Sequence, residues 1–194
     1  MLGKQAKTLT NAQARAMLLH LATTRDPDRN KLIFLLSIKA GLRAKEIAEL
    51  TWRMVTDAEG QISREIRLEN SVSKGESGGV IPLNREVAEA LRTWRSQRTI
   101  ECSDGRIVHT QRSRSTSAPA IVNLFRDWYH TLGFEGCSSH SGRRTFITNA
   151  ARKISSVGGS IRDVQALARH SSLSMTQRYI EMDVDAQRKV VDLI

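Results

Sequence analysis

Apolar residues recur at helical spacing over most of the chain. Thr10 and Gln13 form a capping-box pattern at the start of a first predicted helix, which ends before the Asp26–Asp28 break. Lys31–Lys39 is apolar almost all round, which predicts a buried central helix that ends at Gly41. Further helices are predicted over Ala44–Leu50, Asn84–Trp94, Ser117–Leu132, Ser141–Ala151, Ser160–Ala168, Met175–Met182 and Asp185–Leu193.

The residue pattern over Val55–Leu83 is typical of strands rather than helices. Ile62, Ile66 and Leu68 fit a strand, and Val80–Leu83 fits another after a glycine-rich turn that holds Lys74. Ile107 and Val108 could form one more short strand. The pattern predicts an α+β fold that is mostly α-helical, with a small antiparallel β-sheet of at most three strands and Lys74 at or near a hairpin tip.

Charge is the unusual feature of the composition. The 194 residues include 30 Lys and Arg against 20 Asp and Glu, a net charge of +10. That surplus favours a polyanionic partner, and nucleic acid fits better than a membrane because no apolar run is long enough for a transmembrane helix. Cys102 and Cys137 lack the spacing of a zinc site, which favours reduced thiols in a cytoplasmic protein. We expect one domain over residues 1–194, with no internal linker.

Six polar residues occur at positions where a helical fold alone would not require them: Arg43, Lys74, His140, Arg143, His170 and Tyr179. Taken singly, each is more often a solvated charge or a rim residue of the core. Taken together, they are what a phosphodiester transesterase requires. A tyrosine hydroxyl can attack phosphorus if a partner accepts its proton, and planar guanidinium groups suit the charge that gathers on the phosphate oxygens.

Cofactor chemistry has little support in the sequence. There is no carboxylate cluster that would hold a metal ion, and Gly75, Gly78 and Gly79 lack the pattern of an ATP-binding phosphate loop. We therefore expect a reaction that needs neither a metal nor ATP.

The ordered motifs resemble those of the catalytic domain of tyrosine site-specific recombinases, the phage integrase type. The resemblance runs from about Leu9 to the end of the chain, and its carriers are Gly41–Ile47, Lys74 with Val80–Leu83, His140–Phe146 and His170–Tyr179. It implies the integrase catalytic-core fold and a DNA recombinase that cuts and rejoins double-stranded DNA through a 3′-phosphotyrosine. Integration, excision, inversion and resolution of a mobile or invertible element remain open.

The resemblance also implies roles for individual residues. Tyr179 would be the nucleophile, Arg43 and Arg143 would bind the scissile phosphate, Lys74 would be the general acid, His140 would assist proton transfer, His170 would hydrogen-bond a phosphate oxygen, and Glu46 would support the site. Arg112 and Arg114, on an expected exposed loop, and Arg144 are candidate contacts to the DNA backbone. Tyr129 is expected to be a packing or surface residue.

Two residues depart from the family pattern. Arg169 stands where members commonly have glycine before the second histidine, and Gly142 lies inside the His–x–x–Arg motif. We also expect no N-terminal core-binding domain, which would make the chain either a minimal recombinase or a truncated one. The resemblance implies a bacterial, phage or plasmid origin and a nucleoid-associated protein. It further implies a monomer that forms a tetramer on paired sites through its C-terminal helix, with no membrane partner.

Two alternatives remain open from the sequence. A type IB topoisomerase would use a similar set of residues to nick and reseal one strand. A DNA-binding protein of the same fold would occupy recombination sites without exchanging strands.

Overall fold

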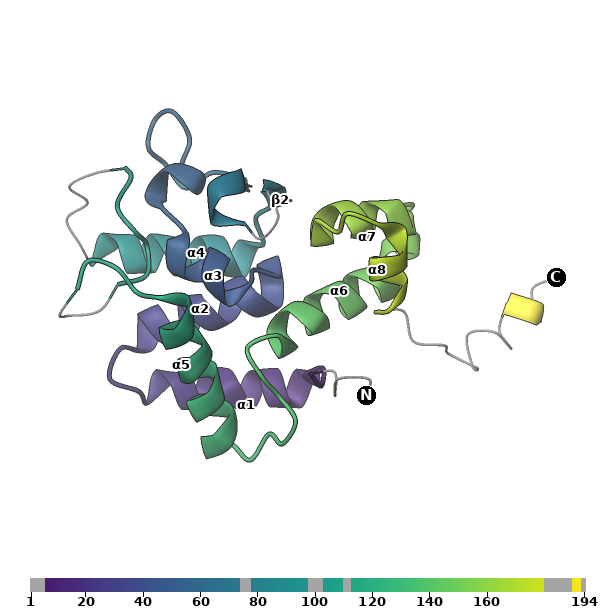
Figure 1. Cartoon of the computed structure of the whole chain (residues 1–194), viewed down its shortest axis with the longest axis horizontal. Coiled ribbons are helices and arrows are strands. Elements are labelled where there is room, and N and C mark those ends of the chain that lie inside the picture. Colours follow the sequence, from purple (N-terminus) through teal and green to yellow (C-terminus); the bar gives the residue numbers. More distant parts are fainter. Residues whose placement is uncertain (1–5, 74–77, 98–102, 110–112, 180–189, 193–194) are drawn as a thin grey trace. The chain divides into compact units, whose positions relative to one another are not determined.

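The structure is a computed structural model, and it describes residues 6–73, 78–97, 103–109, 113–179 and 190–192. Packing divides the chain into two compact units, Met1–Phe146 and Ile147–Ile194, called here the large and the small unit. The helices and strands are α1 Asn11–Ala22, α2 Pro27–Ala40, α3 Ala44–Glu49, β1 Glu65–Leu68, β2 Gly79–Pro82, α4 Arg85–Ser96, α5 Ala118–Thr131, α6 Ser141–Lys153, α7 Ile161–Ala168 and α8 Leu173–Gln177 (Figure 1).

Helix α2 is the centre of the large unit, as its nearly all-apolar sequence predicts. It packs against α1, α3 and α4, and the six apolar residues that predicted its burial are all buried: Leu32, Ile33, Phe34, Leu35, Leu36 and Ile38. Helix α5 covers α3 and adds Phe125, Trp128 and Tyr129 to the same core. Burying this much apolar surface is the main stabilising term for the large unit.

The sheet is smaller than the upper limit set by the sequence. Strands β1 and β2 pair antiparallel, with Ile66 opposite Ile81. Ile62 takes part only in an isolated bridge with Thr56. The prediction of a strand at Ile107 and Val108 is wrong, because this stretch forms a single bridge at Arg106 and its two apolar side chains are buried without ladder pairing. Lys74 lies outside the described residues.

An N-terminal segment, residues 6–9, is hydrogen-bonded to the start of α6. The backbone N–H of Leu9 donates to Thr145 Oγ1 at 2.8 Å, and Arg144 Nη1 donates to the carbonyl of Ala6 at 3.0 Å. The N–H of Lys7 donates to the carbonyl of Gly136 at 3.1 Å. These three bonds, two to α6 and one to the loop before it, join groups more than 120 residues apart in sequence and fix the segment beside the start of the helix that carries Arg143.

The small unit is built from the rest of α6, then α7 and α8. Helix α7 opens with the predicted capping box, in which Asp163 accepts from the N–H of Ser160 at 2.7 Å. Hydrogen bonds from the backbone and the side chain of Ser160 lower the pKa of the Asp163 carboxyl. Helix α8 begins before the predicted Met175 and ends at Gln177, so Tyr179 lies just beyond it. The prediction of a further helix from Asp185 falls mainly on residues outside the described ranges.

In the part of the chain that the structure describes, no helix is both long enough and apolar enough to cross a membrane.

Candidate functional site

Arg43 is held at the start of α3 by a buried carboxylate. It follows Gly41, whose left-handed backbone (φ 66°) ends α2 and turns the chain into α3. Glu46 is fully buried, and its two oxygens accept from the backbone N–H and from Nη1 of Arg43, each at 2.8 Å. The Arg43 side chain keeps 23% of its surface exposed. The guanidinium is therefore anchored at one end while part of it stays accessible.

Arg143 is anchored at the same turn from the other side. It is 5% exposed, and its Nη1 donates to the carbonyl of Gly41 at 2.6 Å. Arg43 and Arg143 are thus tied to the two ends of the three-residue turn Gly41–Arg43, although exactly 100 positions separate them in sequence. Two guanidinium groups and one carboxylate leave a net positive charge at the turn, which suits an anion.

Gly142 explains how α6 comes close enough to place Arg143 there. A Cβ atom at Gly142 would lie 2.2 Å from Ser37 Oγ of α2. Glycine therefore permits a contact between the two helices that any side chain would prevent. The departure from the family pattern at this position has a packing reason in the structure.

His140 stands directly before α6 and is exposed. Its N–H donates to Ser138 Oγ at 3.3 Å, and its carbonyl accepts from the N–H of Arg144 at 2.9 Å. It lies one helical turn from Arg143, as the His–x–x–Arg spacing predicts. Within the large unit, the structure therefore brings Arg43, Glu46 and Arg143 into direct contact with one turn and sets His140 one turn away along α6.

The small unit holds His170 and Tyr179 together. Their rings stack with centroids 5.4 Å apart and an interplanar angle of 27°. His170 is 7% exposed, and its Nδ1 lies 3.0 Å from Thr176 Oγ1. Tyr179 is half-buried, and its backbone N–H donates to the carbonyl of Thr176 at 2.9 Å. Sequence reasoning missed Thr176, which lies three residues before the tyrosine and is fully buried in α8; no local sequence pattern marked it.

The other tyrosine has a different environment. Tyr129 is buried in α5 between Phe125 and Phe134, as the sequence predicts for a packing residue. Burial, and in second place the nearby Cys137, raises the pKa of its hydroxyl. A phenol kept neutral inside a core is a poor nucleophile, which agrees with the assignment of Tyr129 to packing, while the role of Tyr179 stays a prediction.

Arg169, directly before His170, has a backbone conformation that favours glycine. Its φ is 53°, and in the described residues it is the one non-glycine with positive φ. It ends α7 in the left-handed region, and its side chain is 8% exposed. The glycine that is common at this position in the family therefore suits the left-handed backbone. The arginine here adopts the same conformation at a cost in free energy.

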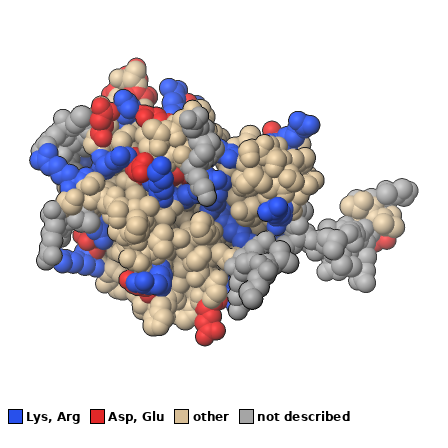
Figure 2. Space-filling view, viewed as in Figure 1, with Lys and Arg blue, Asp and Glu red and all other residues tan. Residues whose placement is uncertain are grey.

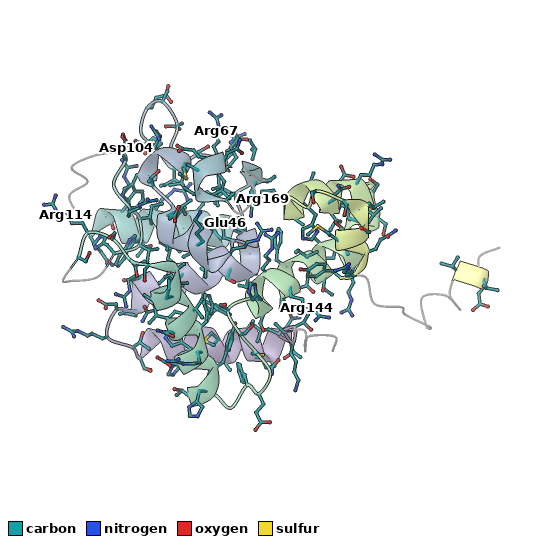
Figure 3. All side chains as sticks on the ribbon, in the orientation of Figure 1. Glu46, Arg67, Asp104, Arg114, Arg144 and Arg169 are labelled. Atoms are coloured by element: carbon teal, nitrogen blue, oxygen red, sulfur yellow. The ribbon has the colours of Figure 1, made fainter. Side chains whose placement is uncertain are left out.

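The remaining candidates from the sequence are placed as follows. Lys74 and Arg112 lie outside the described residues. Arg114 is exposed on the loop before α5, at the edge of the view in Figure 3. Arg144 donates to the carbonyl of Ala6, so at least one end of its guanidinium has a structural partner. Contacts of these residues with DNA stay predictions.

A pocket of about 270 Å³ lies elsewhere in the large unit, between α2 and α5. It is lined by Arg29, Ile33, Val108, His109, Thr116, Ala120, Asn123, Leu124 and Asp127, none of which is a candidate from the sequence. Arg29 is already bonded to Asp26 and Asn30. Among the described residues, no group of three or more His, Cys, Asp or Glu side chains could hold a metal ion.

Comparison with known proteins finds a family and relatives that agree with one another. Residues 7–185 match the phage integrase family. The chain is 29% identical over 195 residues to the tyrosine recombinase XerC of Shewanella oneidensis, which covers 97% of this chain and 60% of the relative. It is 31% identical over 185 residues to the tyrosine recombinase XerA of Thermococcus kodakarensis, which covers 94% of this chain and 61% of the relative. The chain thus spans about three fifths of the length of these relatives.

Solved structures confirm the fold predicted from the sequence. The Tn1549 transposon integrase in complex with transposon right-end DNA aligns with a TM-score of 0.73 and 19% identity over 98% of this chain and 66% of that one. The XerA recombinase crystal structure aligns with a TM-score of 0.68 and 20% identity over all of this chain and 65% of that one. The mostly helical α+β fold with its small antiparallel sheet is that of tyrosine-recombinase catalytic cores, and the chain belongs to the phage integrase family.

Proposed function

We propose that this chain is the catalytic part of a site-specific DNA recombinase that cuts and rejoins DNA through a 3′-phosphotyrosine. The observation that supports it most is the anchoring of Arg43 and Arg143 at one turn, with Glu46 buried beneath Arg43. Two fixed guanidinium groups at one place fit a phosphate that gathers negative charge during the reaction. The stacked pair His170 and Tyr179 adds a tyrosine beside an imidazole.

The proposed reaction conserves the phosphodiester. The Tyr179 oxygen attacks phosphorus, a P–O bond to tyrosine forms, and the bond from phosphorus to the 5′ oxygen breaks. His140 takes part in removing the tyrosine proton, and Lys74 supplies the proton to the departing 5′ oxygen. Arg43, Arg143 and His170 stabilise the charge on the non-bridging oxygens. Attack by a 5′ hydroxyl of another strand reverses the step, so the chemistry needs no external energy source, metal or other cofactor.

Double-stranded DNA is the partner in this proposal. The chain carries a net charge of +10, and Lys and Arg side chains occur at several places on the visible face of the molecule (Figure 2). Related integrase structures were determined in complex with DNA. Binding dominated by phosphate contacts falls steeply as salt rises. A twofold increase in salt that leaves the DNA affinity unchanged would contradict this part of the proposal.

A nicked suicide substrate tests the chemistry directly, because the cleaved end diffuses away and the covalent adduct accumulates. Tyr179→Phe removes the attacking hydroxyl and should abolish the adduct while DNA affinity stays nearly unchanged. Tyr129→Phe is the matched control, since it removes the other tyrosine hydroxyl and should leave adduct formation intact. Adduct that persists in Tyr179→Phe rejects the assignment of the nucleophile. DNA relaxation without pairing of two sites would instead indicate a topoisomerase.

We also propose that the protein is a cytoplasmic monomer that forms a tetramer on paired DNA sites through its C-terminal residues. Val190 and Val191 are 56% and 69% exposed, which leaves apolar surface for a partner. Deletion of residues 185–194 should leave a folded protein that binds DNA but does not complete strand exchange. Sedimentation with site DNA measures assembly, and unchanged assembly of the deletion variant would contradict the proposal.

A further inference from the structure

Thr176 is bonded to both candidate catalytic residues of the small unit. Its hydroxyl oxygen lies 3.0 Å from Nδ1 of His170, and its carbonyl accepts from the backbone N–H of Tyr179 at 2.9 Å. It is fully buried, in the last turn of α8. We propose that Thr176 is a positioning residue that holds neutral His170 in the tautomer with its proton on Nε2. The catalytic role in this inference rests on the proposed function, but the tautomer itself can be measured without DNA.

The direction of the hydrogen bond follows from the donors and acceptors present. A threonine hydroxyl has one proton to donate, and a neutral imidazole has one donor and one acceptor nitrogen. Among the residues that the structure describes, Nδ1 of His170 is the one hydrogen-bond partner of the Thr176 hydroxyl. If Nδ1 carried the proton, the buried hydroxyl would have to accept it and its own proton would have no acceptor, which is costly. The favoured arrangement therefore has Thr176 donating to Nδ1.

The backbone of His170 is fixed independently of this bond. Its N–H donates to the carbonyl of Gln165 at 3.1 Å, and Gln165 Nε2 donates to the carbonyl of His170, also at 3.1 Å. The imidazole is thus attached to α7 through its backbone and to α8 through Nδ1. The main chain of His170 and its Nδ1 atom are held by different groups, so the hydroxyl can be removed without releasing the histidine from α7.

The tautomer decides what His170 can do for a phosphate. With the proton on Nε2, that nitrogen is a donor, as a non-bridging phosphate oxygen requires. With the proton on Nδ1, Nε2 would be an acceptor and would repel the same oxygen. Thr176 also sets the start of the Tyr179 segment through its carbonyl, so one residue positions the donor and the nucleophile that stacks on it.

The test compares Thr176→Val, which keeps the shape and removes the hydroxyl, with Thr176→Ser, which keeps the hydroxyl. Nitrogen-15 NMR of the free protein, at a pH where His170 is neutral, distinguishes protonated from unprotonated ring nitrogens, and His170→Gln assigns the signals. We expect an unprotonated Nδ1 in the parent and in Thr176→Ser, and a mixture of tautomers in Thr176→Val. Thr148→Val is the matched control, because this buried hydroxyl bonds the Tyr179 carbonyl and should leave the His170 tautomer unchanged.

Cleavage of the suicide substrate gives the second readout. Thr176→Val should slow adduct formation about tenfold at saturating DNA, as loss of one positioning hydrogen bond does, and Thr176→Ser should restore most of the rate. A protonated Nδ1 in the parent, or an unchanged tautomer in Thr176→Val, overturns the inference. If the tautomer behaves as expected but no variant or parent forms an adduct, the positioning role in the fold stands and the proposed recombinase function fails.

Discussion

The large and the small unit support their candidate residues in different ways. In the large unit, Arg43 and Arg143 are attached to a turn between helices whose apolar side chains form a continuous buried core, from Leu9 to Tyr129. In the small unit, the buried side chains among the described residues are three apolar ones, Ile147, Val164 and Ala168, and four polar ones, Thr148, Arg169, His170 and Thr176.

This difference has a physical consequence for the proposed reaction. Burial of apolar surface stabilises a fold without requiring contacts of a particular direction. A network of hydrogen bonds fixes the geometry of the groups in it but adds little net stability. A region with few buried apolar contacts opens at a lower free energy than the core of the same protein. We infer that the arginines proposed to bind phosphate lie on the more stable part of the chain, and that the proposed nucleophile lies on the part that rearranges at lower cost.

The largest effect is expected from removing the anchored arginines. Arg43→Ala or Arg143→Ala should slow adduct formation by about 10²–10³-fold, because each removes a fixed donor to the charge of the transition state. Lysine at either position should restore little, since an ammonium group lacks the bidentate fork. Single-turnover cleavage at saturating DNA measures the rate. Arg126→Ala is the matched control, because Arg126 is exposed on α5 and pairs with Asp127; equal loss in that variant would contradict a specific role for the turn.

Core substitutions test the proposed difference in stability. Phe125→Ala in the large unit should lower the free energy of unfolding by about 3–5 kcal/mol. Val164→Ala in the small unit removes less buried surface and should cost about 2 kcal/mol or less. Hydrogen exchange should show that Val164→Ala speeds opening of residues 147–179 and leaves the α2 amides protected. Equal loss of protection in both units would mean that the chain unfolds as one cooperative body and would remove the basis of the comparison.

An intermediate effect is expected where α6 meets α2. Gly142→Ala places a methyl group against Ser37 and should destabilise the protein by about 1–3 kcal/mol through overpacking. Because the same helix carries Arg143, cleavage should fall as well. Ser37→Gly removes the opposing hydroxymethyl group, so the double variant should regain part of both losses. A double variant no better than Gly142→Ala would place the cause in the approach to the α2 backbone rather than in the contact with the Ser37 side chain.

Much of this architecture could be predicted from local patterns. The capping boxes at Thr10 and Ser160, the buried α2 and the stop at Gly41 follow from residue chemistry within one or two turns of helix. The family, which the comparisons confirm, also followed from residue type and order, while the roles of the individual residues stay predictions.

The contacts that hold the site could not be predicted in the same way. The bond from Arg143 to the carbonyl of Gly41 joins positions 102 residues apart, and no periodic pattern reports it. In the sequence, Gly142 suggested only a weak helix start, because Ser37, the residue that it approaches, lies on another helix. Thr176 escaped notice because a single threonine in a short helix is unremarkable until its partner is known. Long-range packing, rather than local propensity, decides these positions.

The smallest effect separates backbone from side chain at Arg169. Its left-handed backbone costs a non-glycine residue about 1–2 kcal/mol relative to its preferred conformation, which glycine avoids, although glycine also loses more entropy on folding. Arg169→Gly and Arg169→Ala both remove the buried side chain, but only alanine keeps the strain, so the glycine variant should be about 0.5–1 kcal/mol more stable than the alanine variant. Chemical denaturation of the two proteins measures the difference. Equal stability would mean that residue 169 does not hold the left-handed conformation in solution. A parent more stable than both would mean that the arginine side chain more than offsets its own backbone strain, and that the small unit depends on polar contacts even where a glycine would fit the chain better.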